Sequence, residues 1–269
     1  MKKRTGFVSL QGFTLIEMSI VLVIIGVLTG GVLLGRSLIR TSELQAVITD
    51  TDNYIAAMGN FKKAYQSLPG DMPNAHLYWG TDSLGCNTGG GATGTCDGNA
   101  DGKIGGVTSQ EYEVFRFWQQ LYDAGMFTQQ LSGAASGGVY NAVIGTNVPA
   151  GKIAGSGFTP VWLGAITGSS TGFCTSGDCF QGVYGNVLQF GGKIAASTSI
   201  TYGPVLTTEQ AAGIDAKIDD GMPGTGKVRA YASTSTLNPG CTNSTAYATA
   251  AYQVGTSGIL CSLIFVTGF

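Results

Sequence analysis

The sequence has few charges and a single histidine. Charged residues make up 11% of the chain and the formal net charge is −2, which excludes a basic surface for nucleic acid. Low charge together with 43% apolar residues also excludes an intrinsically disordered chain. The one histidine, His76, leaves little room for a histidine base or for a zinc site. Glycine is plentiful, with 43 residues, and this indicates a loop-rich domain with many tight turns.

Two short motifs look catalytic but lack the context that catalysis needs. Residues 221–227 fit the glycine spacing of a phosphate-binding loop, but Val228 stands where a serine or threonine must meet magnesium. Residues 168–172 read Gly-Ser-Ser-Thr-Gly, and a disulfide-loop sequence follows where a nucleophile elbow needs a helix. Chance matches are expected in so glycine-rich a chain. We therefore expect that the protein is not an enzyme.

The six cysteines fall into three close pairs. Six cysteines allow fifteen connectivities, and we prefer nearest-neighbour pairing because each pair brackets a loop rich in glycine or serine. An even number at these spacings indicates an oxidising compartment. Buried free thiols are the alternative, and metal ligation is disfavoured because no Cys-x2-Cys spacing occurs. The predicted disulfides are Cys86 with Cys96, Cys174 with Cys179, and Cys241 with Cys261.

The N-terminus is a short basic segment followed by an apolar run. Lys2, Lys3 and Arg4 predict that this end lies on the cytoplasmic side of a membrane. Residues 13–35 are apolar apart from Glu17 and would span about 34 Å as a helix, which matches a hydrocarbon core of about 30 Å. A secretory signal peptide would have a shorter apolar stretch, roughly 7–15 residues, with an Ala-x-Ala-like site after it. A plain membrane anchor would explain the length and the basic flank, but not Glu17.

Glu17 is the most informative residue of this run. A carboxylate inside an apolar span costs several kcal/mol unless it is paired, so it is a functional candidate. Glu17 is the fifth residue of the segment that begins at Phe13. At that depth, a free α-amino group of a neighbouring subunit can reach it. Such an amine exists only if the chain is first cut before Phe13.

Residues 12–17 read Gly-Phe-Thr-Leu-Ile-Glu and resemble the prepilin cleavage and methylation motif of type IV pilins and type II secretion pseudopilins. The resemblance implies that a prepilin peptidase cuts between Gly12 and Phe13 and methylates the new amino group. It also implies that Glu17 pairs with the N-terminus of a neighbour during assembly. The implied location is the bacterial inner membrane, crossed once, with the head in the periplasm. The implied partners are other pilin or pseudopilin subunits, an inner-membrane assembly platform and the lipid bilayer.

We predict an α+β, pilin-like fold in four parts: a leader over 1–12, a transmembrane helix segment over 13–35, the amphipathic half of that helix over 36–68, and an extracytoplasmic head over 69–269. Beyond residue 36, large apolar residues recur at steps of three, four and seven, which is one face of a helix. In the head, an antiparallel sheet with long disulfide-tied loops is expected. The spacing predicts helices over 109–126 and 207–218, and strands over 139–144, 161–166, 183–190 and 259–266.

A candidate calcium loop begins at Asp97. Asp97, Asn99 and Asp101 place side-chain oxygens at positions 1, 3 and 5 of the loop, with Gly102 at the sharp turn of position 6. Lys103 stands at position 7, where such loops use a backbone carbonyl. The cation would hold the three clustered oxygens together and make the loop rigid.

This loop departs from the EF-hand pattern at position 12, which is Thr108 rather than glutamate. Glu111 or Glu113, in the helix that follows, would supply the missing carboxylate. A metal-free surface turn is the alternative. A second group of acids would offer another cation site or cap a solvated turn: Asp215, Asp219 and Asp220.

The expected function is structural. We predict a minor or tip subunit of a filament like a type IV pilus or a type II secretion pseudopilus, because the head is larger than a bulk-packed subunit requires. The alternative is an adhesin or ligand-binding module displayed on the filament, which an exposed aromatic cluster in the head would favour. Segments 68–75 and 214–221 also resemble parts of a group of large prepilin-like proteins, and that resemblance implies no known activity.

Overall fold

The computed structural model describes residues 12–83, 94–105, 113–133, 141–167, 174, 178–194, 200–232 and 238–269. It divides into two compact units, Met1–Glu43 and Leu44–Phe269, and helix α1 contributes residues to both. The elements are α1 (Leu15–Tyr65), α2 (His76–Trp79), α3 (Glu113–Asp123), β1 (Ser156–Ile166), β2 (Gly182–Lys193), β3 (Thr201–Gly203), α4 (Thr208–Ile218), β4 (Val228–Ala230) and β5 (Leu263–Val266). This is the predicted α+β, pilin-like architecture.

Helix α1 confirms the long helix predicted from the sequence. It begins two residues after Phe13 and ends where Gln66 takes a left-handed backbone conformation, with φ of 57°. No proline interrupts its second half. By length and composition, α1 is a helix that can cross a membrane.

The second half of α1 supplies one wall of the head core. Val47 and Phe61 are fully buried and Met58 is 1% exposed. The ring of Tyr54 lies 4.9 Å from that of Trp118 on α3 and 5.1 Å from that of Phe158 on β1, both edge to face. One side chain therefore joins three elements, and the apolar face read from the sequence is the face that packs on the head.

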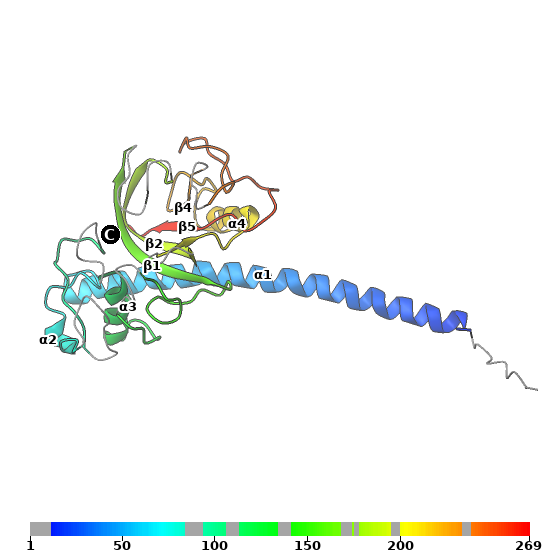
Figure 1. Ribbon diagram of the computed structural model, residues 1–269, viewed down its shortest axis with the longest axis horizontal. Coiled ribbons are helices and arrows are strands. Elements are labelled where there is room, and N and C mark those ends of the chain that lie inside the picture. Colours follow the sequence, from blue (N-terminus) through cyan, green and yellow to red (C-terminus); the bar gives the residue numbers. More distant parts are fainter. Residues whose placement is uncertain are drawn as a thin grey trace, which may run out of the picture. The chain divides into compact units, whose positions relative to one another are not determined.

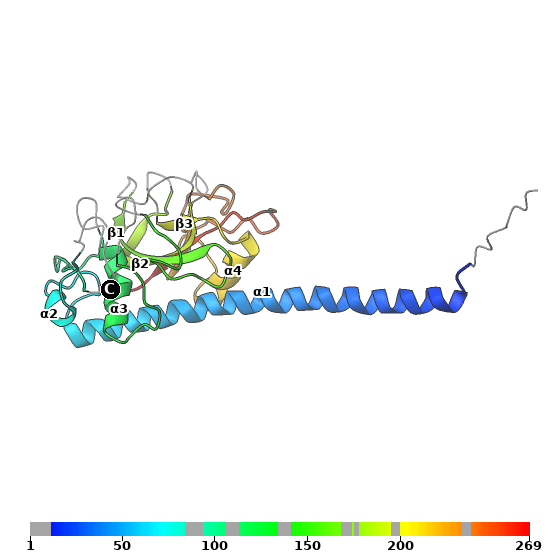
Figure 2. The same ribbon diagram turned by 60° about the horizontal axis from the view of Figure 1, so that its bottom comes forward.

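The strands form one antiparallel sheet in the order β1-β2-β5-β4, with β3 paired to the end of β2. In the long β1–β2 pair, Phe158 faces Phe190 and Val161 faces Val187. Figures 1 and 2 show the sheet and α4 on the same side of α1. Residues 186–192 of β2 are buried on both faces, so the sheet has helix α1 and α3 on one side and covering loops on the other.

The two short helices follow their predicted capping and burial patterns. Thr207 caps α4 by a capping box, because its hydroxyl accepts the Gln210 N–H while the Gln210 side chain accepts the Thr207 N–H. Helix α3 covers the centre of the segment predicted over 109–126, and residues 106–112 lie outside the described residues. Phe117 and Trp118 of α3 are fully buried, as expected of core aromatics.

Several strand predictions need correction. Strand β1 begins five residues before the predicted start at 161, and β3 and helix α2 were not predicted. Of the strand predicted over 139–144, the described residues 141–144 form isolated bridges instead, such as that of Ile144 with Val148. The last strand is shorter than 259–266, because residues before Leu263 pair only at Cys261 with Leu206. Long-range pairing sets these limits, and a local apolar pattern does not report it.

Two of the three predicted disulfides are confirmed. Cys174 is bonded to Cys179, and Cys241 is bonded to Cys261. Cys96 is also disulfide-bonded, and its predicted partner Cys86 lies outside the described residues. The Cys241–Cys261 bond ties the loop after β4 to the segment that leads into β5, which is the loop-tying role expected from the sequence.

Candidate functional site

The start of α1 holds the predicted assembly residue in a specific local geometry. The N–H of Thr14 donates to Glu17 Oε2 at 2.8 Å, and the Thr14 hydroxyl donates to the same oxygen at 2.7 Å. In return, the Glu17 N–H donates to the Thr14 hydroxyl oxygen at 3.3 Å. This is a capping box, which satisfies amides that the first turn of a helix leaves without partners. The spacing of Thr14 and Glu17 is a sequence signal for it that the prediction above did not use.

The apolar surface that follows Glu17 has nothing over it within the described chain. Leu22 is 70% exposed and Leu34 is 71% exposed. Between Glu17 and Arg36 the helix has no ionisable side chain. A surface of this kind is stable only against lipid or against other apolar helices. A carboxylate therefore stands at the entrance to a helix that needs an apolar surrounding.

These features decide what the N-terminus is. Residues 11–33 carry the prokaryotic N-terminal methylation motif. This motif is the prepilin signal of type IV pilins and pseudopilins, so the resemblance noted in the sequence is confirmed. No curated protein and no solved structure matches the chain. The methylation motif covers the N-terminal part alone, and the head has to be interpreted from its own geometry.

The predicted calcium loop is folded around backbone amides. Asn99 and Asp101 direct side-chain oxygens at amides two residues ahead: Asn99 Oδ1 accepts the Asp101 N–H at 3.0 Å and Asp101 Oδ1 accepts the Lys103 N–H at 2.9 Å. Asp97 does not join them. Its carboxylate accepts the His76 N–H at 2.9 Å and lies 2.6 Å from His76 Nδ1. The first predicted ligand is thus engaged with helix α2.

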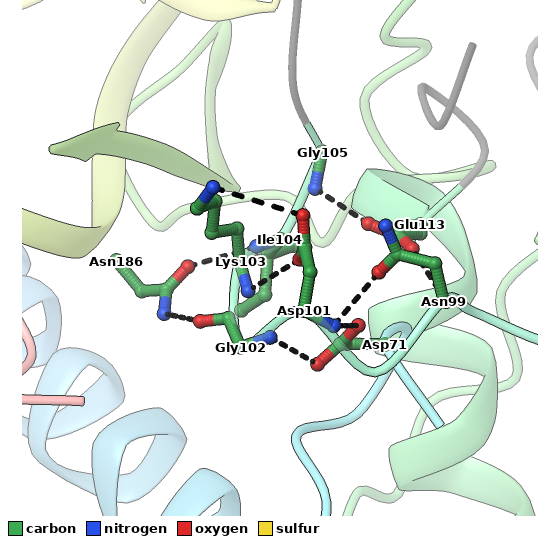
Figure 3. A network of polar contacts seen from close by, with 9 residues as sticks. All are labelled: Asp71, Asn99, Asp101, Gly102, Lys103, Ile104, Gly105, Glu113 and Asn186. Atoms are coloured by element: carbon green, nitrogen blue, oxygen red, sulfur yellow. Dashed lines mark hydrogen bonds and ion pairs between the residues drawn. The ribbon is translucent and has the colours of Figure 1, made fainter. Parts of the chain in front are cut away.

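Two further carboxylates complete this network, which Figure 3 shows. Asp71 accepts the N–H groups of Asp101 and Gly102, at 3.1 and 3.0 Å. Glu113, the first residue of α3, accepts the N–H groups of Asn99 and Gly105, at 3.2 and 2.9 Å. Glu113 was one of the two candidates for the missing ligand, and Glu111 lies outside the described residues. Asp71 was not predicted, because it is 30 residues from Asp101 in the sequence.

The same loop is anchored to the sheet through Asn186 of β2. Asn186 Oδ1 accepts the Ile104 N–H at 2.8 Å, and its amide nitrogen donates to the Gly102 carbonyl at 2.9 Å. Ile104 is fully buried, as expected for an apolar anchor at that position. Lys103 Nζ lies 3.9 Å from Asp101 Oδ2 and over the ring of Trp162. The loop is therefore held by side chains from three separate parts of the head.

Burial changes the acidity of the two carboxylates. Desolvation by burial is the main cause that raises the pKa of Glu113 to about 7. The negative charge of Asp71 raises this pKa further, whereas the hydrogen bonds from the Gly105 and Asn99 amides lower it. Desolvation likewise raises the pKa of Asp71 to about 6. Calcium favours such oxygens, and a bound cation would remove the penalty on their ionised forms. In the described structure the oxygens of Asp71, Asn99, Asp101 and Glu113 bind backbone amides, Asp97 lies outside this set, and calcium stays a prediction.

The acids of the second group accept hydrogen bonds from the turn that follows α4. The ligand atoms of Asp215, Asp219 and Asp220 lie within 4.8 Å of one another. Asp215 accepts the Tyr252 hydroxyl at 2.7 Å and the Gly221 N–H at 3.1 Å. Asp219 and Asp220 accept amides and a hydroxyl between residues 222 and 228. These bonds account for the three acids as caps of the turn between α4 and β4.

Of the two motifs that looked catalytic, residues 221–227 are described by the structure and residues 168–172 are not. Residues 221–227 follow α4 and precede β4, whereas a phosphate-binding loop joins a strand to a helix. Residues 168–172 lie outside the described residues. The segment 221–227 therefore lacks the strand-to-helix context of a phosphate-binding loop.

Proposed function

We propose that this protein is a structural subunit of a filament like a type IV pilus or a type II secretion pseudopilus. The observation that carries the proposal is the methylation motif at the head of an uncovered apolar helix, with Glu17 at its fifth position after the expected cut. A soluble protein would bury such a helix, and a plain anchor would not place a carboxylate in it. We propose no catalytic activity for the head.

The proposed assembly step follows from the state of Glu17. In the described structure its carboxylate is bonded to a single residue of its own chain, Thr14. Cleavage by a prepilin peptidase after Gly12 creates an α-amino group on Phe13. A cation brought next to Glu17 by a neighbouring subunit compensates the carboxylate far better in an apolar surrounding than neutral donors do. The pairing therefore draws a subunit from the membrane into the filament at the correct depth.

The proposed location is the bacterial inner membrane, with one span and the head in the periplasm. Basic residues at positions 2–4 keep the leader in the cytoplasm, and disulfides in the head suit an oxidising compartment. The partners are the prepilin peptidase, other pilin-like subunits and an inner-membrane assembly platform. The large head favours a minor subunit over a bulk one.

A second candidate is a ligand-binding module displayed on the filament. The observation that favours it is an aromatic cluster around α2, where Leu77 is 72% and Tyr78 is 58% exposed. The Tyr78 ring lies 5.4 Å from that of Tyr65 and 5.7 Å from that of Trp79. Exposed aromatic clusters are frequent at binding surfaces. Tyr78→Ala would abolish adhesion without affecting assembly if this function is correct.

The decisive experiment combines mass spectrometry with a filament assay in the native bacterium. The mature protein should begin with N-methylated Phe13, and an intact Met1 start would contradict the proposal. Glu17→Ala should be cleaved normally but recovered in the sheared filament fraction at least roughly tenfold less, since each tenfold is about 1.4 kcal/mol and a lost pair costs more. Ser19→Ala, which removes a neutral polar group two residues on, is the control and should assemble normally.

A further inference from the structure

A groove runs between α1 and the edge of the sheet in the unit Leu44–Phe269. It has a volume of about 650 Å³, and its apolar walls come from four elements. Ile48 and Ile55 belong to α1, Ile218 ends α4, and Val228 and Phe265 belong to β4 and β5. An apolar groove with this many contributors accepts a helix face or another narrow apolar segment.

The rim of the groove carries basic side chains on one side and an acidic side chain on the other. Lys217 and Lys227 lie on the side of α4 and β4, and Asp52 lies on α1. All three are exposed, and none takes part in an ion pair within the described residues. The rim therefore offers two unpaired ammonium groups and one unpaired carboxylate to whatever occupies the groove.

A matching surface exists elsewhere on the same chain. Arg36, Ile39, Arg40 and Glu43 line one depression on the surface of α1, as expected from their spacing of three and four residues. Ile39 is 62% exposed. The three charged residues form no ion pair within the described chain. Over roughly 10 Å of helix, this face presents basic groups, an apolar side chain and then an acid.

We propose that the groove receives residues 36–43 of α1 from a second copy of this chain. Ile39 packs on the apolar walls, Glu43 pairs with Lys217 and Lys227, and the arginines face Asp52. The charges complement each other on both sides, and charge complementarity fixes the register of an interface. The two surfaces are different parts of one chain, so the contact is head-to-tail and joins two copies wherever they are neighbours in the filament. The inference rests on the proposed function.

The first test captures the contact between full-length copies in membranes of the host. One copy carries Ile39→Cys and a second, tagged copy carries Ile218→Cys, and both are oxidised mildly. The described native cysteines are all disulfide-bonded, so a mixed disulfide reports the new pair. We expect a cross-linked dimer that contains one tagged and one untagged copy. Leu77→Cys, on α2 and more exposed than Ile218, is the control partner and should give none. No dimer with Ile218→Cys, or equal dimer with Leu77→Cys, overturns the inference.

The second test reverses charges and then restores them. Glu43→Lys alone, and Lys217→Glu with Lys227→Glu, should each lower recovery in the filament fraction by roughly fivefold, the size expected for exposed charge pairs. Combining the three substitutions should restore recovery, and Lys63→Glu should change nothing. If the lysine reversals lower recovery but Glu43→Lys neither lowers nor restores it, a lipid or another subunit fills the groove and the inference is wrong.

The two proposals fail in different ways. If the unsubstituted chain keeps its leader or never enters a filament, the proposed function is wrong. If it is cleaved and assembles, but the mixed disulfide and the charge restoration both fail, only the inference about the groove is wrong. A subunit present once, at the tip, would assemble without the mixed disulfide, so that result also refutes the contact between two copies.

Discussion

Burial of Glu113 predicts that the head loses stability as the pH rises. In the folded chain the carboxyl holds its proton up to about pH 7, whereas in the unfolded chain it releases it near the ordinary value of 4.5. Between these values the unfolded state binds fewer protons, so the free energy of unfolding falls with rising pH and levels off above pH 7. A pKa that moves from 4.5 to about 7 corresponds to about 3 kcal/mol, at about 1.4 kcal/mol per unit.

The assay is denaturant unfolding of the full-length protein in detergent, followed by tryptophan fluorescence between pH 5 and pH 8. Trp118 lies on α3 with Glu113 and is fully buried, so its emission reports this part of the head. Because the Glu113→Gln side chain does not titrate, this variant should lose about 2.5 kcal/mol less across that range than the unsubstituted protein. Asp52→Asn, at an exposed position of α1, is the matched control and should keep the original slope.

The outcome that refutes this reasoning is specific. If the metal-free protein is as stable at pH 8 as at pH 5, or if Glu113→Gln keeps the full slope, then the carboxyl is ionised in the folded state. That result would mean that the amide donors from Asn99 and Gly105 outweigh its burial. Measurements in chelator are essential, because a bound cation would also stabilise the ionised form.

Two more predictions concern the same head. If calcium binds the network, millimolar Ca²⁺ should raise the Tm of the full-length protein and a chelator should lower it. The Asp101→Ala variant should show neither change. An unchanged Tm of the unsubstituted protein in chelator would mean that the network binds no calcium. Asp97→Ala is a poorer test, because losing the His76 contact would lower the Tm with or without calcium. Arg116→Ala should cost about 3–5 kcal/mol of unfolding free energy, because it leaves the buried Asp82 carboxylate, 2.7 Å from the guanidinium, without that cation. A loss below about 1 kcal/mol in urea unfolding would contradict it.

The features that the sequence predicted well are those with local causes. The apolar run, the helix period beyond residue 36 and the Thr207–Gln210 cap all depend on residues three or four positions apart. The disulfides Cys174–Cys179 and Cys241–Cys261 join neighbours in the sequence, where loop closure favours pairing. The methylation motif is likewise a short linear signal, which explains why the N-terminal site was found without the fold.

The features that only the tertiary structure decided depend on residues far apart in the sequence. Asp97 fits a calcium loop by spacing, but His76, 21 residues away, takes its carboxylate. Asp71 enters the network from 30 residues away, and Asn186 from more than 80. No local pattern reports which amides will be brought to a given carboxylate, because the chain's long-range packing places them. The N-terminus therefore follows from the sequence, whereas the chemistry of the head had to await its fold.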